Sequence, residues 1–219
     1  MSFVTGIREF GLEYFLKLAS WTVPFGVFRY EHTLILAARN PIFEVEDTDQ
    51  VQNHLLTENE VDQLEHLNVS LTVALERLAS GDFCAAAFKE SKLAAMCWSA
   101  RGKIFIKDAG CPLEISPEAF YVYNALTHES ARGKGLYRHS AQLVVRSNSL
   151  DGRTIAMCAI SRFNTHSLDI NRRVGFRDVG EVFLFRLFGL SLLWYRKWPY
   201  QVSRFSCSLG SNLQGLRVI

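Results

Sequence analysis

Residues 127–140, THESARGKGLYRHS, contain the densest group of positions that could do chemistry. An apolar strand pattern ends at Leu126, a turn with Gly133 and Gly135 follows, and a helical pattern begins at Lys134. Glycine lets the backbone adopt positive φ and approach a ligand closely. The free N–H groups and the positive dipole end of a helix N-terminus favour an anion. The segment therefore predicts a binding site for a phosphate or pyrophosphate group.

Three basic side chains, Arg132, Lys134 and Arg138, surround this turn and would add favourable charge for an anion. Other glycine-rich phosphate motifs do not fit. The segment lacks the G-x-x-x-x-G-K-[ST] pattern, and Arg138 replaces the third glycine of the dinucleotide motif G-x-G-x-x-G. As a local pattern alone, Gly-Lys-Gly is equally compatible with a solvated turn.

The same segment resembles the signature of the GCN5-related N-acetyltransferases (the GNAT superfamily), R/Q-x-x-G-x-G/A, which lies between a strand and a helix. Arg132 and Gly135 match the signature, and Tyr137 stands where Gly or Ala is usual. A larger side chain fits at that place if it points away from the phosphates.

A second resemblance follows in NTHSLDINRRVGF, which is similar to the GNAT pattern N-x-x-A/S-x-x-x-Y-x-x-x-G-F. Asn164, Ser167, Gly175 and Phe176 match, whereas Asn171 stands where the family often has Tyr. The residues themselves also predict a helix that is capped by Asn164 and ended by Gly175. Both interpretations hold together, because the family uses that helix start at its cofactor site.

The resemblance implies binding of acetyl-CoA, or another acyl-CoA, and direct attack of an amine on the thioester in a ternary complex. In that scheme the pyrophosphate rests on the glycine turn, the pantetheine follows the preceding strand, and a backbone amide there polarises the thioester carbonyl. The residues that this resemblance assigns to cofactor binding are Leu126, Thr127, Arg132, Gly133, Lys134, Gly135, Leu136, Tyr137, Arg138, Asn164 and Ser167.

The acid and the base of such a reaction are open, because Asn171 cannot donate the proton that a Tyr would. The nearest candidates are Tyr123, His128 and Glu129, and His128 has a reference pKa of about 6.5 that suits base work. Alternatively, the thiolate leaves unaided, since a thiol pKa of about 8.5 makes it a fair leaving group. A catalytically inactive GNAT-fold protein that binds acyl-CoA or a partner is the alternative function.

The elements that must position these residues follow from hydrophobic periodicity. Thr57 and Glu60 form a capping box that predicts the start of a long helix, which Gly81 ends. Residues 41–53 and 105–117 are expected to be loops. The pattern predicts helices over residues 6–20, 57–80, 134–148 and 164–174, and strands over residues 33–38, 82–89, 93–100, 120–126, 154–160, 183–188 and 190–195.

This order of elements predicts an α/β or α+β three-layer domain. The resemblance implies a mixed, mostly antiparallel central sheet that is splayed in the middle and flanked by helices. We expect a helical extension over residues 1–30 that packs against the domain, a GNAT-like acyltransferase domain over residues 31–198 and a loose tail over residues 199–219.

Composition limits the other functions. The 219 residues have a net charge of +2, which excludes a basic field over the whole molecule for nucleic acid. Residues 116–219 nevertheless carry fourteen basic and six acidic side chains, so a peripheral membrane or nucleic-acid binder is a rival interpretation. Five cysteines without C-x-x-C spacing favour reduced thiols in a cytoplasmic protein and no metal site.

The acceptor is left open between a small-molecule amine and a peptide, as are the acyl chain length and a homodimeric assembly. No apolar run approaches the roughly 20 residues that a membrane-spanning helix needs, and no signal peptide is expected. An acidic loop could attract a cationic amine, although a solvated loop is the simpler interpretation. Its acidic residues are Glu44, Glu46, Asp47 and Asp49.

Overall fold

Two compact units, each with its own strands and helices, make up the chain. The computed structural model describes residues 3–24, 27–43, 51–106, 111–197, 202–209 and 216–217. Unit 1 comprises Met1–Ala37, Phe105–Glu114 and Ala159–Val218. Unit 2 comprises Ala38–Ile104 and Ile115–Cys158, together with Ile219.

Unit 2 is built on a mixed sheet in which antiparallel pairs predominate. Its strand order is β8-β7-β4-β3-β2, where only the first part of β8 belongs to this unit. The β7–β8 pair is parallel, whereas the pairs β2–β3, β3–β4 and β4–β7 are antiparallel. The strands are β2 (Val51–Leu55), β3 (Phe83–Lys89), β4 (Lys92–Ala100), β7 (Ala119–Thr127) and β8 (Ile155–Ser161).

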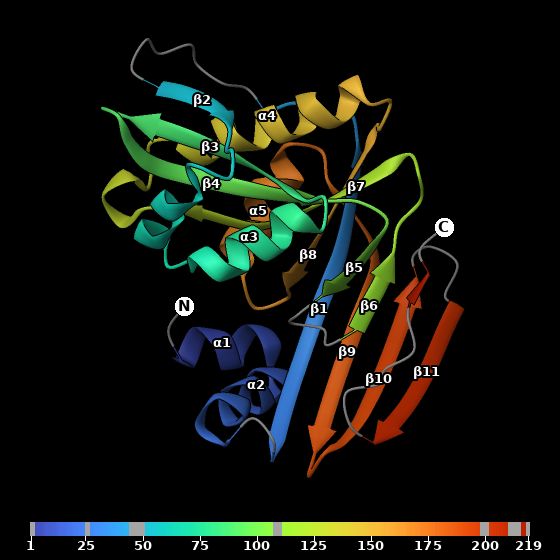
Figure 1. Cartoon of the computed structure of the whole chain (residues 1–219). Coiled ribbons are helices and arrows are strands. Elements are labelled where there is room, and N and C mark those ends of the chain that lie inside the picture. Colours follow the sequence, from blue (N-terminus) through green and yellow to red (C-terminus); the bar gives the residue numbers. More distant parts are fainter. Residues whose placement is uncertain are drawn as a thin grey trace. The chain divides into compact units, whose positions relative to one another are not determined.

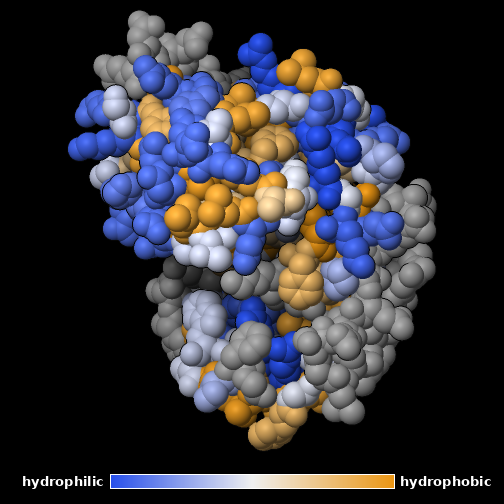
Figure 2. Space-filling model, in the orientation of Figure 1, coloured by the Kyte–Doolittle hydropathy of each residue, from blue (hydrophilic) through white to orange (hydrophobic). Residues whose placement is uncertain are grey.

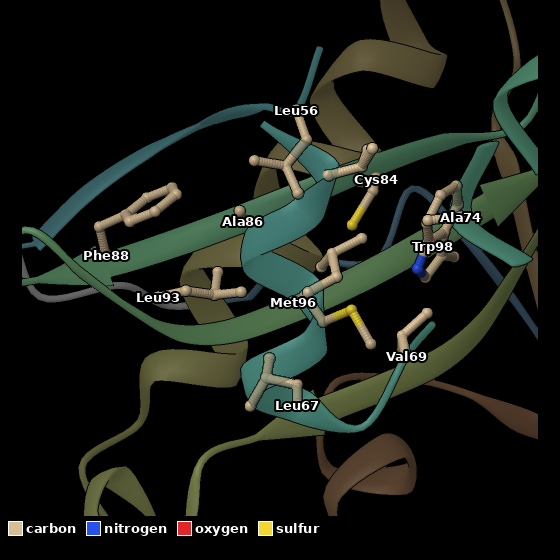
Figure 3. Close-up of a cluster of buried hydrophobic side chains, with 12 residues drawn as sticks. Leu56, Leu67, Val69, Ala74, Cys84, Ala86, Phe88, Leu93, Met96 and Trp98 are labelled. Atoms are coloured by element: carbon tan, nitrogen blue, oxygen red, sulfur yellow. The ribbon is translucent and has the colours of Figure 1, made fainter. Parts of the chain in front are cut away.

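Helices cover both faces of this sheet (Figure 1). On one face, η1 (Val61–Leu67) and α3 (Leu71–Ala79) lie over larger side chains of β3 and β4, among them Met96 and Trp98 (Figure 3). On the other face, α4 (Leu136–Leu150) packs on β4, β3 and β2. The side chains buried there are small, because alternate residues of a strand point to opposite faces and those toward α4 are mostly alanines. Unit 2 is therefore a three-layer arrangement, as predicted.

The long helix predicted over residues 57–80 is wrong. The Glu60 carboxylate does accept the backbone N–H of Thr57 at 3.0 Å, as in a capping box, but a 3₁₀ helix follows instead of an α-helix. Asn68 then adopts the left-handed conformation (φ 60°), and Ser70 caps a separate α3 through the N–H of Val73. The leucine periodicity runs through this break because both short helices bury their apolar side on the same sheet.

A tight two-residue turn joins β3 and β4, the strands predicted over residues 82–89 and 93–100. Glu90 and Ser91 both have positive φ (51° and 60°), as the two central residues of a type I′ turn require. This turn matches the twist of the paired strands and sets the register Lys89↔Lys92.

Unit 1 contains a second run of antiparallel strands in the order β11-β10-β9-β1. The predicted strand over residues 33–38 extends to β1 (Phe28–Arg39), most of which belongs to this unit. The predicted pair around Gly189 is confirmed as β9 (Arg177–Leu187) and β10 (Leu190–Lys197). The expected loose tail is wrong in part, because β11 (Val202–Leu209) pairs along the full length of β10.

Helices α1 (Phe3–Phe10) and α2 (Leu12–Thr22) replace the single helix predicted over residues 6–20, since Gly11 takes φ 56° between them. They pack within unit 1, as expected. Lys17 of α2 donates to Glu31 of β1 at 2.5 Å, and both side chains are buried. Unit 1 also contains α5 (Thr165–Arg173), which confirms the predicted helix and its stop at Gly175 (φ 97°).

The loop expected over residues 105–117 is also wrong. A small sheet with the order β12-β6-β5 contains β5 (Lys103–Ile106), β6 (Cys111–Glu114) and β12 (Leu216–Arg217). Likewise, residues 51–53 of the other expected loop belong to β2, and its acidic residues at positions 44–49 lie outside the described residues.

The described helices include none that is long and apolar enough to cross a membrane. On the face seen in Figure 2, hydrophilic and hydrophobic side chains are interspersed.

Candidate functional site

The glycine turn before α4 has the geometry that its sequence predicts. Gly133 and Gly135 adopt positive φ (77° and 73°), and α4 begins at Leu136, two residues later than expected. A Cβ placed on either glycine would have no heavy atom within 4 Å beyond its chain neighbours. The backbone of this turn is therefore uncovered on the side where a side chain would stand.

Buried residues hold both ends of the turn in place. Ala131 and Leu136 belong to one apolar cluster with Ala87, Ala94 and Ala95, in the layer between the sheet and α4. The turn thus sits on the rigid sheet of unit 2 while its glycines stay exposed.

The charges around the turn are exposed and only loosely paired. Arg132 lies 3.6 Å from the Glu129 carboxylate, with both side chains more than 60% exposed. Lys134 donates through Nζ to the Ser130 carbonyl at 2.9 Å. Arg138 is exposed in the first turn of α4. An anion at this helix start would therefore meet positive charge that exposed ion pairing barely neutralises.

Tyr137, the departure from the GNAT signature, points into the unit. Its ring packs edge-to-face on Phe43 with centroids 6.0 Å apart. Burial raises the pKa of its hydroxyl well above the usual value. A large residue is accommodated here because its ring packs on Phe43 and leaves the glycine turn uncovered.

An open cleft of about 420 Å³ lies beside the turn, within unit 2. It brings together five residues that the sequence singled out and adds the end of η1, which sequence reasoning missed. The lining residues that the sequence named as cofactor-binding or catalytic candidates are Leu126, Thr127, His128, Glu129 and Arg132, and the additional ones are His66, Leu67 and Asn68.

Strand β7 is irregular just before it reaches this cleft. Met96 of β4 pairs with Leu126, but Trp98 pairs with Tyr123, so two residues of β7 stand opposite one of β4. One of these two, Asn124, has φ 45°. Such a bulge interrupts the ladder and turns backbone groups away from the neighbouring strand.

The three catalytic candidates lie in different surroundings. His128 and Glu129 line the cleft, and His128 Nδ1 lies 2.9 Å from the Ser130 hydroxyl. Tyr123 does not line the cleft, and its hydroxyl donates to Asp82 at 2.5 Å. Burial is the main cause that raises the pKa of Tyr123 far above its usual value, and the hydrogen bond to Asp82 is the second.

The residues of the second motif, 164–176, lie in unit 1. Asn164 caps α5, where its Oδ1 accepts the backbone N–H of Ser167 at 3.2 Å. Asn171 is buried and donates through Nδ2 to the Ser167 carbonyl at 2.8 Å. The Asn171 side chain therefore bonds to the backbone of its own helix, α5.

Sequence reasoning missed a buried cluster of ionisable residues in unit 1. His32 of β1 has no exposed surface, and its ring nitrogens lie 3.0 Å from Glu13 and 3.1 Å from Glu181. The ring also packs on Phe183, with centroids 3.9 Å apart. The sequence signal was weak: a Glu-His pair inside an apolar strand pattern, with one partner 149 residues away.

Comparison with solved structures identifies the fold. A protein assigned to the GNAT family of acetyltransferases, from Novosphingobium aromaticivorans, matches with a TM-score of 0.50 and 16% identity over 68% of this chain and 60% of that chain. A conserved protein of unknown function from Staphylococcus epidermidis matches with a TM-score of 0.54 and 9% identity, over 78% of this chain and 65% of that chain. An aminoglycoside N-acetyltransferase in complex with CoA matches with a TM-score of 0.50 and 14% identity, over 62% of this chain and 93% of that chain.

The chain therefore has the GNAT fold, and the predicted fold class is confirmed. It spans about three fifths of the length of the first solved structures that it matches. No protein-family profile and no curated protein sequence matches it. Among the described residues, no group of three or more His, Cys, Asp or Glu side chains could hold a metal ion.

Proposed function

We propose that this chain is an acyl-CoA-dependent N-acyltransferase, which transfers an acetyl group from acetyl-CoA to a primary amine in a ternary complex. The observation that carries this proposal is the uncovered turn at Gly133 and Gly135, directly before α4. It presents backbone N–H groups at the positive end of a 15-residue helix, where a pyrophosphate binds favourably.

The residues of the turn fit CoA because the space that a Cβ would fill is open at both glycines. The backbone N–H groups from Gly133 to Tyr137 would hold the pyrophosphate, because that of Arg138 already donates to the Gly135 carbonyl at 2.9 Å. The exposed side chains of Arg132, Lys134 and Arg138 would balance its charge. The pantetheine would lie along the end of β7, where Leu126 and Thr127 line the cleft.

Acetyl-CoA would supply the thioester, in which the acyl carbon is bonded to a good leaving group, the CoA thiolate. The amine nitrogen would bond to that carbon, the C–S bond would break, the amine would lose a proton and the thiolate would gain one. A backbone N–H at the bulge near Asn124 would stabilise the charge that develops on the carbonyl oxygen.

His128 and Glu129 are the candidate bases, because both line the cleft. Tyr123 is a poor candidate acid, since its proton is held by Asp82 and its pKa is strongly raised. Departure of the thiolate without a protein acid fits this chain better, because a thiol pKa of about 8.5 allows it near neutral pH.

Further support comes from the CoA complex of the aminoglycoside N-acetyltransferase that shares the fold. By analogy, we propose a small-molecule or peptide amine as the acceptor. The alternative function, an acyl-CoA-binding protein without turnover, is favoured by one observation. Asn171, at the place of the family's Tyr, is buried and bonded to the Ser167 carbonyl.

Calorimetric titration of acetyl-CoA tests the cofactor assignment. Gly135→Glu places a side chain and a negative charge in the open space, so we expect it to abolish binding. Gly152→Glu is the matched control, because Gly152 also has positive φ (76°) and open space, but lies beyond the other end of α4. Both variants incur similar backbone strain of about 1–2 kcal/mol, because a residue with a Cβ disfavours positive φ.

Equal affinity in wild type and Gly135→Glu would refute the cofactor site. If wild type and Gly152→Glu bind acetyl-CoA and Gly135→Glu does not, a screen of primary amines for release of free CoA thiol follows. Turnover with any amine supports the enzyme, and binding without turnover supports the alternative.

A further inference from the structure

Unit 1 contains a cavity of about 360 Å³, a size at the lower end of the range for small-molecule sites. It lies among α1, α5, β1, β9 and β10 of this unit. Phe10, Leu34 and Leu168 give it an apolar wall. The remaining lining residues are polar or charged, and three of them are arginines.

Most of these charges already have partners within the protein. Glu181 is buried and lies between His32 Nε2, at 3.1 Å, and the guanidinium of Arg196. At the rim, Arg172 donates two hydrogen bonds to Asp178, at 2.9 and 3.2 Å. The buried Glu181 carboxylate is held in place by its two partners, whereas the Arg172–Asp178 pair is exposed, with side chains 43% and 37% accessible, and contributes little.

Two opposite charges at the cavity lack a close partner among the described residues. Arg162 has a single ion pair among the described residues, a long one of 3.9 Å to Glu13, and its guanidinium lies over the Phe10 ring. Glu9 has no ion pair in the described ranges of the chain. A planar guanidinium binds a carboxylate through two parallel hydrogen bonds, and a carboxylate binds an ammonium group.

We propose that this cavity binds an α-amino acid with an apolar side chain. The carboxylate of the ligand would pair with Arg162 and its ammonium group with Glu9, while the side chain would lie against Phe10, Leu34 and Leu168. A ligand with one of the two charges would leave the other protein charge unanswered. The site goes beyond the proposed acyl transfer and does not depend on CoA.

The test uses the full chain and L-phenylalanine as the probe, titrated by calorimetry or by ligand-observed NMR. Two matched compounds each lack one charge: phenethylamine has no carboxylate, and 3-phenylpropionate has no amine. We expect L-phenylalanine to bind at least about tenfold more tightly than either, because a charge-assisted hydrogen bond is lost in each case. This comparison needs no variant and so is independent of folding.

Variants locate the site. Arg162→Gln and Glu9→Gln are each expected to weaken L-phenylalanine binding by about tenfold or more. Arg146→Gln and Glu76→Gln are the controls, since both residues are exposed on helices of unit 2, and they should bind as wild type does.

Three results would overturn the site: no binding of L-phenylalanine, binding of either single-charge compound as tightly as L-phenylalanine, or wild-type affinity in both cavity variants. Gly135→Glu separates this outcome from the CoA proposal. It should bind L-phenylalanine normally while failing to bind acetyl-CoA, so either assignment can fail alone.

Discussion

The hydroxyl of Tyr123 on β7 donates a hydrogen bond of 2.5 Å to Asp82, the residue just before β3. Asp82 is half-buried, and this burial raises the pKa of its carboxyl, although the bond from Tyr123 and the nearby Arg77 act in the opposite direction. The guanidinium carbon of Arg77 also lies over the rings of Trp98 and Tyr123, at 5.0 and 5.1 Å from the ring centroids. Tyr123 is therefore part of a structural cluster that holds its proton.

This cluster predicts a pH dependence of stability. Because the folded pKa of Asp82 lies above the unfolded reference of 3.8, its favourable contribution is present below pH 3.8 and is lost as pH rises through the folded pKa. Asp82→Asn stays neutral, and its amide oxygen can still accept from Tyr123. We expect the Tm of Asp82→Asn to gain on wild type between pH 4 and pH 7.5.

Thermal melts at both pH values check this expectation, with the exposed Asp169→Asn as control. A Tm difference between Asp82→Asn and wild type that stays constant with pH would contradict it.

The two asparagines of α5 should separate stability from the proposed activity. Asn164→Ala removes the N-cap and should destabilise the protein by about 1 kcal/mol, whereas Asn164→Ser keeps a capping oxygen. Asn171→Ala removes a buried hydrogen bond and should destabilise by about 1–3 kcal/mol. We nevertheless expect the folded Asn171→Ala protein to lose less of its steady-state rate than Asn164→Ala. Comparable losses of rate would speak against this ranking.

The buried thiols should be chemically inert in the folded protein. Burial raises the pKa of Cys84, Cys111 and Cys158 to about 12, and that of Cys97 well above its usual value. Because the thiolate is the reactive form, iodoacetamide at pH 8 should leave these four cysteines unmodified. Unfolding in guanidinium chloride should expose all four. Peptide mass spectrometry checks both states, and rapid native labelling of any of the four would show that its burial is wrong.

The fold was predictable where the signal is local. The two strands on either side of Glu90 and Ser91, and the helix capped by Asn164, depend on adjacent residues and were predicted, whereas the type I′ geometry of the turn was not. The break at Asn68 was missed because the leucine periodicity continues across it. Strand β6 was missed because Pro112 is typical of a loop and the strand is only four residues long. The division at residues 30 and 198 stays a prediction.

The candidate site divides in the same way. Gly133 and Gly135 could be identified from the sequence because the turn and the start of the next helix lie in adjacent residues. The direction of the Tyr137 side chain depends on its packing against Phe43, which the motif alone does not specify. His32 could not be found, because Glu13 and Glu181 reach it from an earlier helix and from a strand 149 residues later.

The place of β1 in the sheet has a consequence for biosynthesis. Thr33 pairs with Val182, so the strand emerges from the ribosome long before its neighbour exists. At about 5–20 residues per second, the nascent segment waits on the order of 10 s or more with its hydrogen-bonding edge unmatched. Unit 2 is continuous in sequence from Ala38 to Cys158 apart from Phe105–Glu114, so it can fold during this time. We therefore expect chaperones to bind the nascent chain at β1 while its partner strand β9 has not yet been synthesised.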